Sequence, residues 1–149
     1  LPGSTQSRSS AASDVFKSQL QYYPGARLDV AEIDPLVVRV AHDFFQVPED
    51  PRLQISVADG RVFLRRARKS YDVIIMDAYG TSPYGLYLPY HLTTIEFFKI
   101  AREHLKDGGC LVYNTVEVDR RTKRDRVQDL MTTLGKVFEF TYALSLIPI

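Results

Sequence analysis

The sequence predicts an α/β fold with a mostly parallel, doubly wound sheet, and two patterns carry this prediction. Three apolar runs each end on an acidic residue: residues 28–34 (LDVAEID), 53–59 (LQISVAD) and 71–77 (YDVIIMD). Each run is followed by a stretch that reads as loop or helix, and such alternation is typical of βαβ units. Ligands of parallel sheets bind outside the carboxyl ends of the strands. The acidic residues at these ends are therefore candidate site residues: Glu32, Asp34, Asp59 and Asp77.

Length and composition narrow the function classes. A chain of 149 residues is one domain by length and is long enough for a core. A net charge of +1 with 45% hydrophobic residues argues against a disordered tail or a strongly basic nucleic-acid binder. No apolar run reaches the roughly 20 residues of a membrane span. We therefore expect no nucleic-acid partner and no membrane association.

The N-terminal residues predict no targeting signal. Residues 1–14 are Ser-rich and lack the apolar centre of a signal peptide, so we expect an arm or loop there and one α/β domain over residues 15–149. Cys110 is the only cysteine and lies in an apolar run, as a small core residue would. Without a disulfide framework, the cytoplasm is the expected location.

The first half of the chain predicts two strands and three helices. Residues 14–23 have helical spacing and are stopped by Pro24-Gly25. A strand over 28–33 leads to Asp34-Pro35, a capping carboxylate followed by proline at the first helical position. The next helix has an apolar stripe expected to be buried and ends at Pro48 and Pro51. A second strand over 53–58 leads through Asp59-Gly60 into a short basic helix. The apolar stripe of the helix that begins at Asp34-Pro35 comprises Val37, Val38, Ala41, Phe44 and Phe45.

The second half predicts a central strand and a Tyr-rich loop. Residues 73–76 are almost wholly apolar, as a central parallel strand should be. A loop over 79–90 leads to Thr93 and Glu96, whose spacing is that of a capping box opening a helix over 94–106. Its expected inner face is Ile95, Phe98, Ala101 and Leu105.

The C-terminal part predicts two more strands with a helix between them. Asp107-Gly108-Gly109 turns the chain into a strand over 110–116. A helix over 123–134 follows, with Gly135 as its stop, and residues 138–149 read as a final strand. The stripe of that helix is Val127, Leu130, Met131 and Leu134.

The acidic strand ends differ in what they are expected to do. Asp34 caps its helix. Glu32 has no such structural duty, so we expect it to accept hydrogen bonds from ribose hydroxyls. Asp59 either caps the next helix, with Gly60 allowing the tight turn, or contacts an adenine amino group. Asp77 follows four apolar residues and must emerge at the strand's end, where it could hold a cationic amine, accept its proton, or only orient it.

Five ordered blocks together resemble the spermidine synthase family, in its spermidine synthase-like bacterial branch. The blocks are LDVAEIDP, DPRLQISVADGRVFL, YDVIIMDAYG, HLTTIEFF and LKDGGCLVYN, between about Tyr22 and Val116. The resemblance implies a methyltransferase-like Rossmann fold that binds decarboxylated S-adenosylmethionine or S-adenosylmethionine. It also implies aminopropyl transfer to a small amine such as putrescine. In the family's pattern, Glu32 matches the ribose-binding acid, Asp59 the adenine-side acid, and Asp77 the first aspartate of the catalytic loop. Gly60, beside Asp59, is a further candidate for cofactor binding.

Three departures from the family's pattern stand out. Before Gly25 the chain has only Gly3, so the glycine-rich loop and the core strand before it are missing. Gly80 stands where the family has a second aspartate. The N-terminal hairpin domain that helps to close the polyamine pocket has no counterpart. The missing strand would leave unpaired backbone groups, so we expect the N-terminal segment to fill the gap, the remaining strands to close up, or another chain to supply the partner.

The remaining polar features leave alternatives open. The tyrosines beside Asp77 either line an amine pocket through cation–π contact or pack as a surface loop. Tyr79, two residues after Asp77, is the second catalytic candidate together with Asp77. His42 and His104 lack partners at metal spacing, so we assign no metal. Two basic clusters read as solvated helix faces. The loop tyrosines are Tyr79, Tyr84, Tyr87 and Tyr90, and the clusters are Arg61, Arg65, Arg66, Arg68, Lys69 and Arg120, Arg121, Lys123, Arg124, Arg126.

Two other functions compete with aminopropyl transfer. Methyl transfer from S-adenosylmethionine is a variant within enzymes, because Gly80 weakens the case for diamine chemistry. The second class is a catalytically inactive or truncated domain that serves as an interaction or assembly module. An exposed strand edge would then favour a homodimer formed by strand pairing. The chain could also be a fragment of a longer protein.

Overall fold

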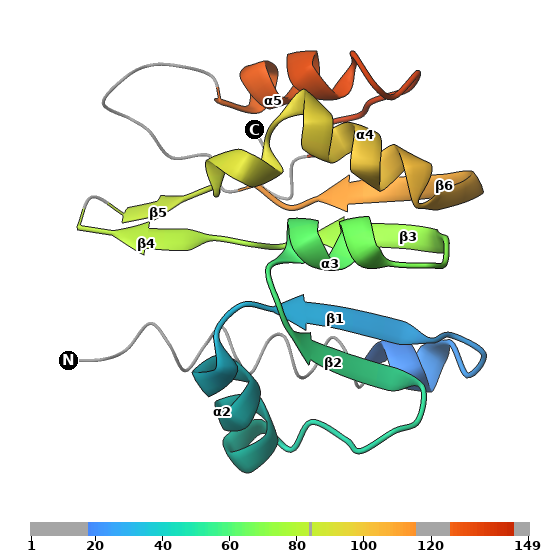
Figure 1. The fold of residues 1–149 in the computed structure, drawn as a ribbon, viewed down its shortest axis with the longest axis vertical. Coiled ribbons are helices and arrows are strands. Elements are labelled where there is room, and N and C mark those ends of the chain that lie inside the picture. The colour runs from blue at the N-terminus through green and yellow to red at the C-terminus, as the bar shows by residue number, and fades with distance from the viewer. Residues whose placement is uncertain (1–17, 84, 116–125, 145–149) are drawn as a thin grey trace. The chain divides into compact units, whose positions relative to one another are not determined.

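The structure of this chain is a computed structural model that describes residues 18–83, 85–115 and 126–144 (Figure 1). Its contacts divide the chain into two compact units, a first unit over Leu1–Phe63 and a second unit over Leu64–Ile149. Each unit is described by itself. The single domain over residues 15–149 stays a prediction, and the Ser-rich residues 1–14 lie outside the described residues.

The first unit contains a short parallel sheet. Strand β1 (Leu28–Glu32) pairs with β2 (Leu53–Val57) in register from Leu28 opposite Leu53 to Glu32 opposite Val57. Helix α2 (Pro35–Phe45) connects the two strands, which completes a βαβ unit (Figure 1). Helix α3 (Gly60–Arg66) begins at the end of this unit. The predicted strands and the helix between them are therefore confirmed.

Helix α2 starts where the sequence predicts but is less buried than expected. The Asp34 Oδ1 atom accepts a hydrogen bond from the Leu36 amide at 2.8 Å, and Pro35 opens the helix. The helix ends at Phe45, followed by Gln46 with a φ of 50°. Val37 and Phe44 are 41% and 74% exposed, so the predicted buried stripe is wrong for these two residues. A sheet of two strands is too narrow to cover the whole apolar stripe of a helix.

Arg52 links the N-terminal part of the first unit to the start of β2 through hydrogen bonds. Residues 18–22 are helical, as predicted, and are followed by a turn at Pro24-Gly25. The Arg52 guanidinium donates to the carbonyl oxygens of Leu20 at 3.2 Å and Pro24 at 2.9 Å. It also pairs with the Asp50 carboxylate at 2.6 Å, which lowers the pKa of Asp50.

The second unit places a parallel strand pair against two helices. Strand β3 (Tyr71–Met76) pairs with β6 (Leu105–Tyr113), and an irregularity in register lies between Tyr71 and Val73. Helices α4 (Ile95–Glu103) and α5 (Arg126–Leu134) also belong to this unit. The region predicted as a loop contains a hairpin of β4 (Gly80–Ser82) and β5 (Gly85–Tyr87), followed by a 3₁₀ turn, η1 (Tyr90–Leu92).

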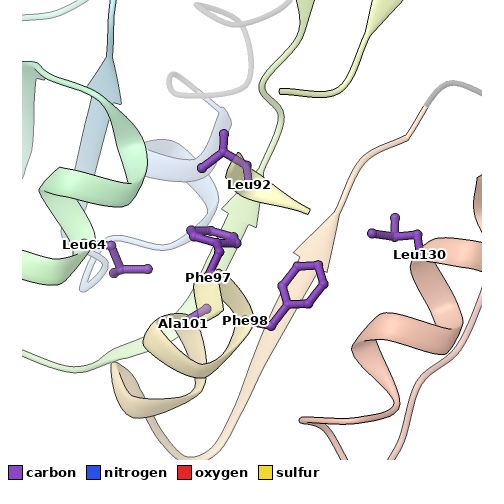
Figure 2. Close-up of a cluster of buried hydrophobic side chains, with 6 residues drawn as sticks. All are labelled: Leu64, Leu92, Phe97, Phe98, Ala101 and Leu130. Atoms are coloured by element: carbon purple, nitrogen blue, oxygen red, sulfur yellow. The ribbon is translucent and has the colours of Figure 1, made fainter. Parts of the chain in front are cut away.

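The core of the second unit centres on two phenylalanines of α4. Phe97 and Phe98 are fully buried, with ring centroids 5.8 Å apart. The Phe98 ring meets the Tyr113 ring of β6 edge-on at 6.1 Å. Figure 2 shows the six buried side chains of this cluster, which come from α3, η1, α4 and α5: Leu64, Leu92, Phe97, Phe98, Ala101 and Leu130.

The opposite face of the β3–β6 pair is exposed. Val73 and Ile75 are 47% and 52% exposed, and Val112, which lies opposite Ile75 in the register, is 47% exposed. The apolar pattern of residues 73–76 predicts a central strand, which a parallel sheet buries on both faces, but in the second unit β3 is exposed on one face. Alternate residues of a strand point to opposite faces. The core therefore covers the side of Ile74 and Met76 and leaves the other side open.

Helix α4 and strand β6 differ from prediction at their shared boundary. Thr94, not Thr93, caps the helix, since its hydroxyl accepts from the Phe97 amide at 3.3 Å. The helix ends at Glu103, and Leu105 is buried as predicted, but as the first residue of β6. Gly108 has a φ of 74°, and a Cβ at Gly109 would lie 3.0 Å from the Asp72 carbonyl oxygen. Both glycines therefore fit a strand that bends as it joins β3.

The C-terminal elements are confirmed in part. Leu130 of α5 is buried, and the helix stops at Leu134 before Gly135, as predicted. Residues 138–144 form no strand, so the predicted final strand is wrong there; residues 145–149 lie outside the described part of the chain. Phe140 and Leu144 are 69% and 90% exposed, and without a pairing strand an extended segment has no ladder to join. Among the described helices, none is long and apolar enough to span a membrane.

The two parallel pairs remain separate sheets in the described residues. Closing up of the remaining strands into one sheet stays a prediction. Residues 1–17, expected as one possible filler, lie outside the described residues. A partner strand from another chain stays a prediction.

Candidate functional site

Glu32 lies at the carboxyl end of β1 and is half-buried. Its Oε1 atom accepts a hydrogen bond from the Asp34 amide at 2.9 Å. Glu32 thus has a structural duty in the turn before α2, and the expectation that it has none is wrong. Its second carboxylate oxygen, Oε2, makes no hydrogen bond to the described residues, so it remains available to accept from a ligand. Ribose binding by Glu32 stays a prediction.

Asp59 lies beside Glu32 at the same edge of the first sheet. The amide of Ala58 donates to the Glu32 carbonyl oxygen at 2.9 Å, which continues the β1–β2 pairing to the residue before Asp59. The Asp59 Oδ1 atom accepts from the Val62 amide at 2.9 Å, so Asp59 caps α3. Contact with an adenine is a further role that stays a prediction.

Gly60 is not needed for the turn that we predicted. Among the glycines of the described residues, only Gly108 has a positive φ, so the backbone at Gly60 does not require glycine. A Cβ built at Gly60 would meet no atom within 4 Å. Its role in cofactor binding stays a prediction.

Asp77 lies at the carboxyl end of β3 and is exposed. Its Oδ1 atom accepts a hydrogen bond from the Asn114 carboxamide at 2.8 Å. The Asn114 amide also donates to the Met76 carbonyl oxygen at 2.9 Å, which places Asn114 directly after β6 and level with Asp77. Sequence reasoning missed Asn114, although its position at the end of the fourth apolar run matched that of the carboxylates.

Tyr79 lies two residues after Asp77 and is half-buried, with its hydroxyl oxygen buried. Tyr113 lies near enough to Tyr79 for the charge of Tyr79 to affect the pKa of Tyr113. Burial first, and the Tyr79 charge second, raise the pKa of Tyr113 to about 12. The Tyr113 hydroxyl donates to the Leu92 carbonyl oxygen at 3.3 Å. A catalytic role for Tyr79 stays a prediction.

The hairpin beyond Tyr79 is closed by an aromatic contact. A Cβ at Gly80 would overlap the Tyr87 ring and lie 2.6 Å from its hydroxyl oxygen. The Tyr87 side chain is 40% exposed, and Tyr90 is 83% exposed. Tyr84 lies outside the described residues. The Tyr-rich segment is therefore a hairpin in which a side chain at Gly80 would require the exposed Tyr87 ring to shift.

The structure brings the site residues together in two pairs, one in each unit. Glu32 and Asp59 share the carboxyl edge of the β1–β2 sheet, and Asp77 shares the carboxyl edge of the β3–β6 sheet with Asn114. Each pair thus occupies the edge at which ligands of parallel sheets bind. A hollow of about 430 Å³ in the first unit lies elsewhere, around His42 and the first residues of β2.

The histidines and basic residues take no part in these two pairs. His104 ends α4, where its Nδ1 and Nε2 atoms lie 2.9 Å from the Ile100 and 3.2 Å from the Ala67 carbonyl oxygens. Groups of three or more possible metal ligands are absent from the described residues. Lys69, in the first basic cluster, lies 5.9 Å from the centre of the Tyr71 ring. The second cluster, apart from Arg126 in α5, falls outside the described residues.

One family model matches most of the chain. The family model of the spermine/spermidine synthase domain matches residues 15–149. This chain belongs to that family. The resemblance inferred from the five blocks of sequence is thereby confirmed.

Individual relatives and solved structures resemble this chain over part of their length. A probable polyamine aminopropyl transferase from Bifidobacterium longum is 36% identical over 94 residues, which are 63% of this chain and 20% of the relative. A probable spermidine synthase from Corynebacterium glutamicum matches 80% of this chain and 41% of that structure, with 30% identity and a TM-score of 0.66. The human methyltransferase-like protein 13, solved in complex with SAH, matches 87% of this chain and 60% of that structure, with 24% identity and a TM-score of 0.73.

These comparisons confirm the predicted fold class. The chain has the α/β fold with parallel strands that spermidine synthases and methyltransferases share. The chain spans about a fifth of the length of the Bifidobacterium relative and two fifths of the Corynebacterium structure.

Proposed function

We propose that this domain transfers an aminopropyl group from decarboxylated S-adenosylmethionine to a small amine. In this proposal Glu32 and Asp59 hold the nucleoside, and Asp77 holds the incoming amine. Membership of the spermine/spermidine synthase domain family supports the class of reaction. The proposal includes a cytoplasmic location and no metal.

The reaction requires the protein mainly to bind the two substrates and to orient them. The lone pair of a neutral amine attacks the carbon beside the sulfonium sulfur, so that a C–N bond forms and the C–S bond breaks. The sulfur keeps the electron pair and leaves as the neutral thioether methylthioadenosine. The product nitrogen then loses a proton. A carboxylate that fixes the amine and accepts this proton supplies positioning and electrostatic stabilisation.

The geometry of Asp77 is the observation that carries the proposal. Its carboxylate is exposed at the carboxyl end of a parallel strand, and Asn114 of the neighbouring strand holds one of its oxygens. This leaves Oδ2 to accept from an amine in a defined direction. Charge-assisted hydrogen bonds of this kind are stronger than those between neutral groups.

The residues of the first unit suit an S-adenosyl nucleoside. Vicinal ribose hydroxyls need an acceptor, and Glu32 has Oε2 available at the edge of the β1–β2 sheet. A nucleoside approaching α3 would meet open space beside Gly60. The bound compound would supply the sulfonium and the group that is transferred.

Replacing Asp77 by Asn tests the proposal. Turnover of decarboxylated S-adenosylmethionine with an amine should be abolished, while the affinity for methylthioadenosine should change little, because Asp77 holds the amine. Asp72→Asn is the matched control: it removes an exposed carboxylate from the other end of β3, paired there with Lys106. Unchanged turnover in Asp77→Asn would remove this residue from the mechanism.

Product mass separates aminopropyl transfer from methyl transfer. The fold alone serves both chemistries, since a methyltransferase structure covers more of this chain than the probable spermidine synthase does. Incubation with S-adenosylmethionine and, separately, with its decarboxylated form should give a product only from the latter. A methylated amine would replace the proposed reaction with methyl transfer.

An assembly module is the second candidate, and the exposed face of β3–β6 favours it. Val73, Ile75 and Val112 are each about half exposed on that face, and apolar patches of this kind are typical of interaction surfaces. Under this alternative the chain associates at micromolar concentration and lacks turnover. Sedimentation over a range of concentrations tests it: a strict monomer would count against the module.

A further inference from the structure

The hollow of about 430 Å³ in the first unit takes no part in the proposed function. It is lined by the last turn of α2, by the loop that follows this helix, and by residues of β2. Glu32 and Asp59, at the carboxyl edge of the same sheet, do not line it. Its volume lies within the range of about 300–1,000 Å³ that is typical of small-molecule sites.

Apolar side chains form one part of the wall of this hollow. Leu53 and Ile55 are alternate residues of β2, so they point to the same face of the sheet, and both are half-buried. Pro48 and Pro51 of the loop line the hollow as well. This part of the wall suits methylene groups, which gain free energy when they leave water.

The loop that carries the polar part of the wall is held in one conformation. The Arg52 guanidinium pairs with the Asp50 carboxylate at 2.6 Å, and the Arg52 amide donates to Asp50 Oδ1 at 2.8 Å. The Leu53 amide donates to the Asp50 carbonyl oxygen at 2.9 Å. The wall is therefore formed before a ligand binds, which lowers the entropic cost of binding.

The polar groups around the hollow favour a positive charge. Glu49 contributes an exposed carboxylate. His42 lies in the last turn of α2, and the carboxyl end of a helix attracts cations through its dipole. Among the described residues, His42, Glu49 and Asp50 do not form a group that could hold a metal ion. An organic cation therefore fits this wall better than a metal ion does.

We propose that this hollow binds a short alkylamine, a free small molecule with one ammonium group and an aliphatic chain. The ammonium group lies at Glu49, and the chain lies over Leu53 and Ile55. This site is independent of the proposed function, because it uses neither the nucleoside-binding acids nor Asp77. An amine bound in the hollow leaves both carboxyl edges open.

Butylamine is the probe, and butanol and methylamine are its matched partners. Butanol has a similar chain without the charge, and methylamine has the charge without the chain. Each compound is titrated into the full chain at neutral pH, and the backbone amides are followed by two-dimensional NMR. We expect butylamine to shift the amides of Glu49, Leu53 and Ile55.

The relative affinities test both parts of the wall. Butylamine should bind about threefold more tightly than butanol, because an exposed ion pair contributes little. It should bind about tenfold more tightly than methylamine, because its additional methylene groups leave water in part. Equal affinity of the three compounds, or the absence of shifts at the hollow, would overturn the inference.

A pair of charge variants locates the ammonium group. Glu49→Gln should lower the affinity for butylamine to that for butanol. Asp43→Asn, which removes an exposed carboxylate of α2 that does not line the hollow, is the matched control and should leave the affinity unchanged. Butylamine binding that is equally tight in Glu49→Gln would contradict the proposal.

Asp77→Asn separates this inference from the proposed function. The shifts at the hollow should persist in this variant, since Asp77 belongs to the other unit. If butylamine shifts only amides near Asp77, the inference is overturned while the proposed function stands. If the chain lacks turnover but butylamine shifts the amides of the hollow, the proposed function fails and the inference stands.

Discussion

At the scale of the residue, the site depends on how each carboxylate is held. Glu32 and Asp77 each use one oxygen to fix local structure, accepting from Asp34 and Asn114, and Asp59 accepts from the Val62 amide as the cap of α3. Structural and functional roles are therefore not alternatives at these positions. A carboxylate has two oxygens, and a hydrogen bond to one of them directs the other.

Asn114 is the residue whose role can be tested most cleanly. Asn114→Ala removes the donor to Asp77, so we expect kcat/KM for the amine to fall about tenfold, the lower end of what a hydrogen bond to a charged group contributes. The KM for the amine should carry the loss, and methylthioadenosine affinity should not change. Steady-state kinetics at varied amine concentration measures this split. An unchanged KM would mean that Asn114 does not position Asp77.

At the scale of the element, the sequence predicted most strands and caps because their signals are local. Asp34-Pro35 opens α2, and Gly135 follows the end of α5, as the capping rules require. The exposed face of β3 and the missing C-terminal strand were not predictable in this way. Burial and strand pairing depend on which partners the chain supplies, and periodicity carries no information about them.

The site residues also divide into those that local sequence predicts and those that depend on strand pairing. Three acids at strand ends could be found from the sequence, because apolar runs that end on a charge mark where each strand meets solvent. Asn114 and the contact of Tyr87 with Gly80 were missed, because both depend on register: β6 must lie beside β3, and β5 beside β4. Pairing between distant segments is what a single sequence shows least.

The cap of α2 gives a prediction at this scale. Asp34→Ala removes the acceptor of the Leu36 amide, and we expect a loss of about 1 kcal/mol in the free energy of unfolding. Asp43→Ala, an exposed change in the same helix, should stay within about 0.5 kcal/mol of the unaltered chain. Urea denaturation compares the two. Equal stability of both variants would contradict the capping role.

At the scale of the whole molecule, two small parallel sheets are each covered in part. In the first unit α2 leaves Phe44 exposed, and in the second unit the face with Ile75 is exposed. Parallel sheets are generally buried on both faces. Each unit by itself therefore leaves part of its apolar surface exposed.

The stability of the chain should fall at alkaline pH because of Tyr113. Its folded pKa of about 12 lies above the ordinary value of 10.0, so the folded state holds a proton that the unfolded state loses between these values. Stability that is present below pH 10 is thus lost as pH rises toward 12. Tyr113→Phe should flatten this part of the curve, measured by urea denaturation at stepped pH. A curve of the same slope in the variant would contradict the assignment.

Calorimetric titration with methylthioadenosine and S-adenosylmethionine tests the central claim most directly. Glu32→Gln keeps an oxygen that can accept from the Asp34 amide but removes the negative charge that would face the ribose. The control is Glu103→Gln, which changes an exposed residue of α4. The account predicts that the unaltered chain and Glu103→Gln bind alike and that Glu32→Gln binds more weakly. Absence of binding at millimolar ligand, or binding that Glu32→Gln leaves unchanged, would contradict it.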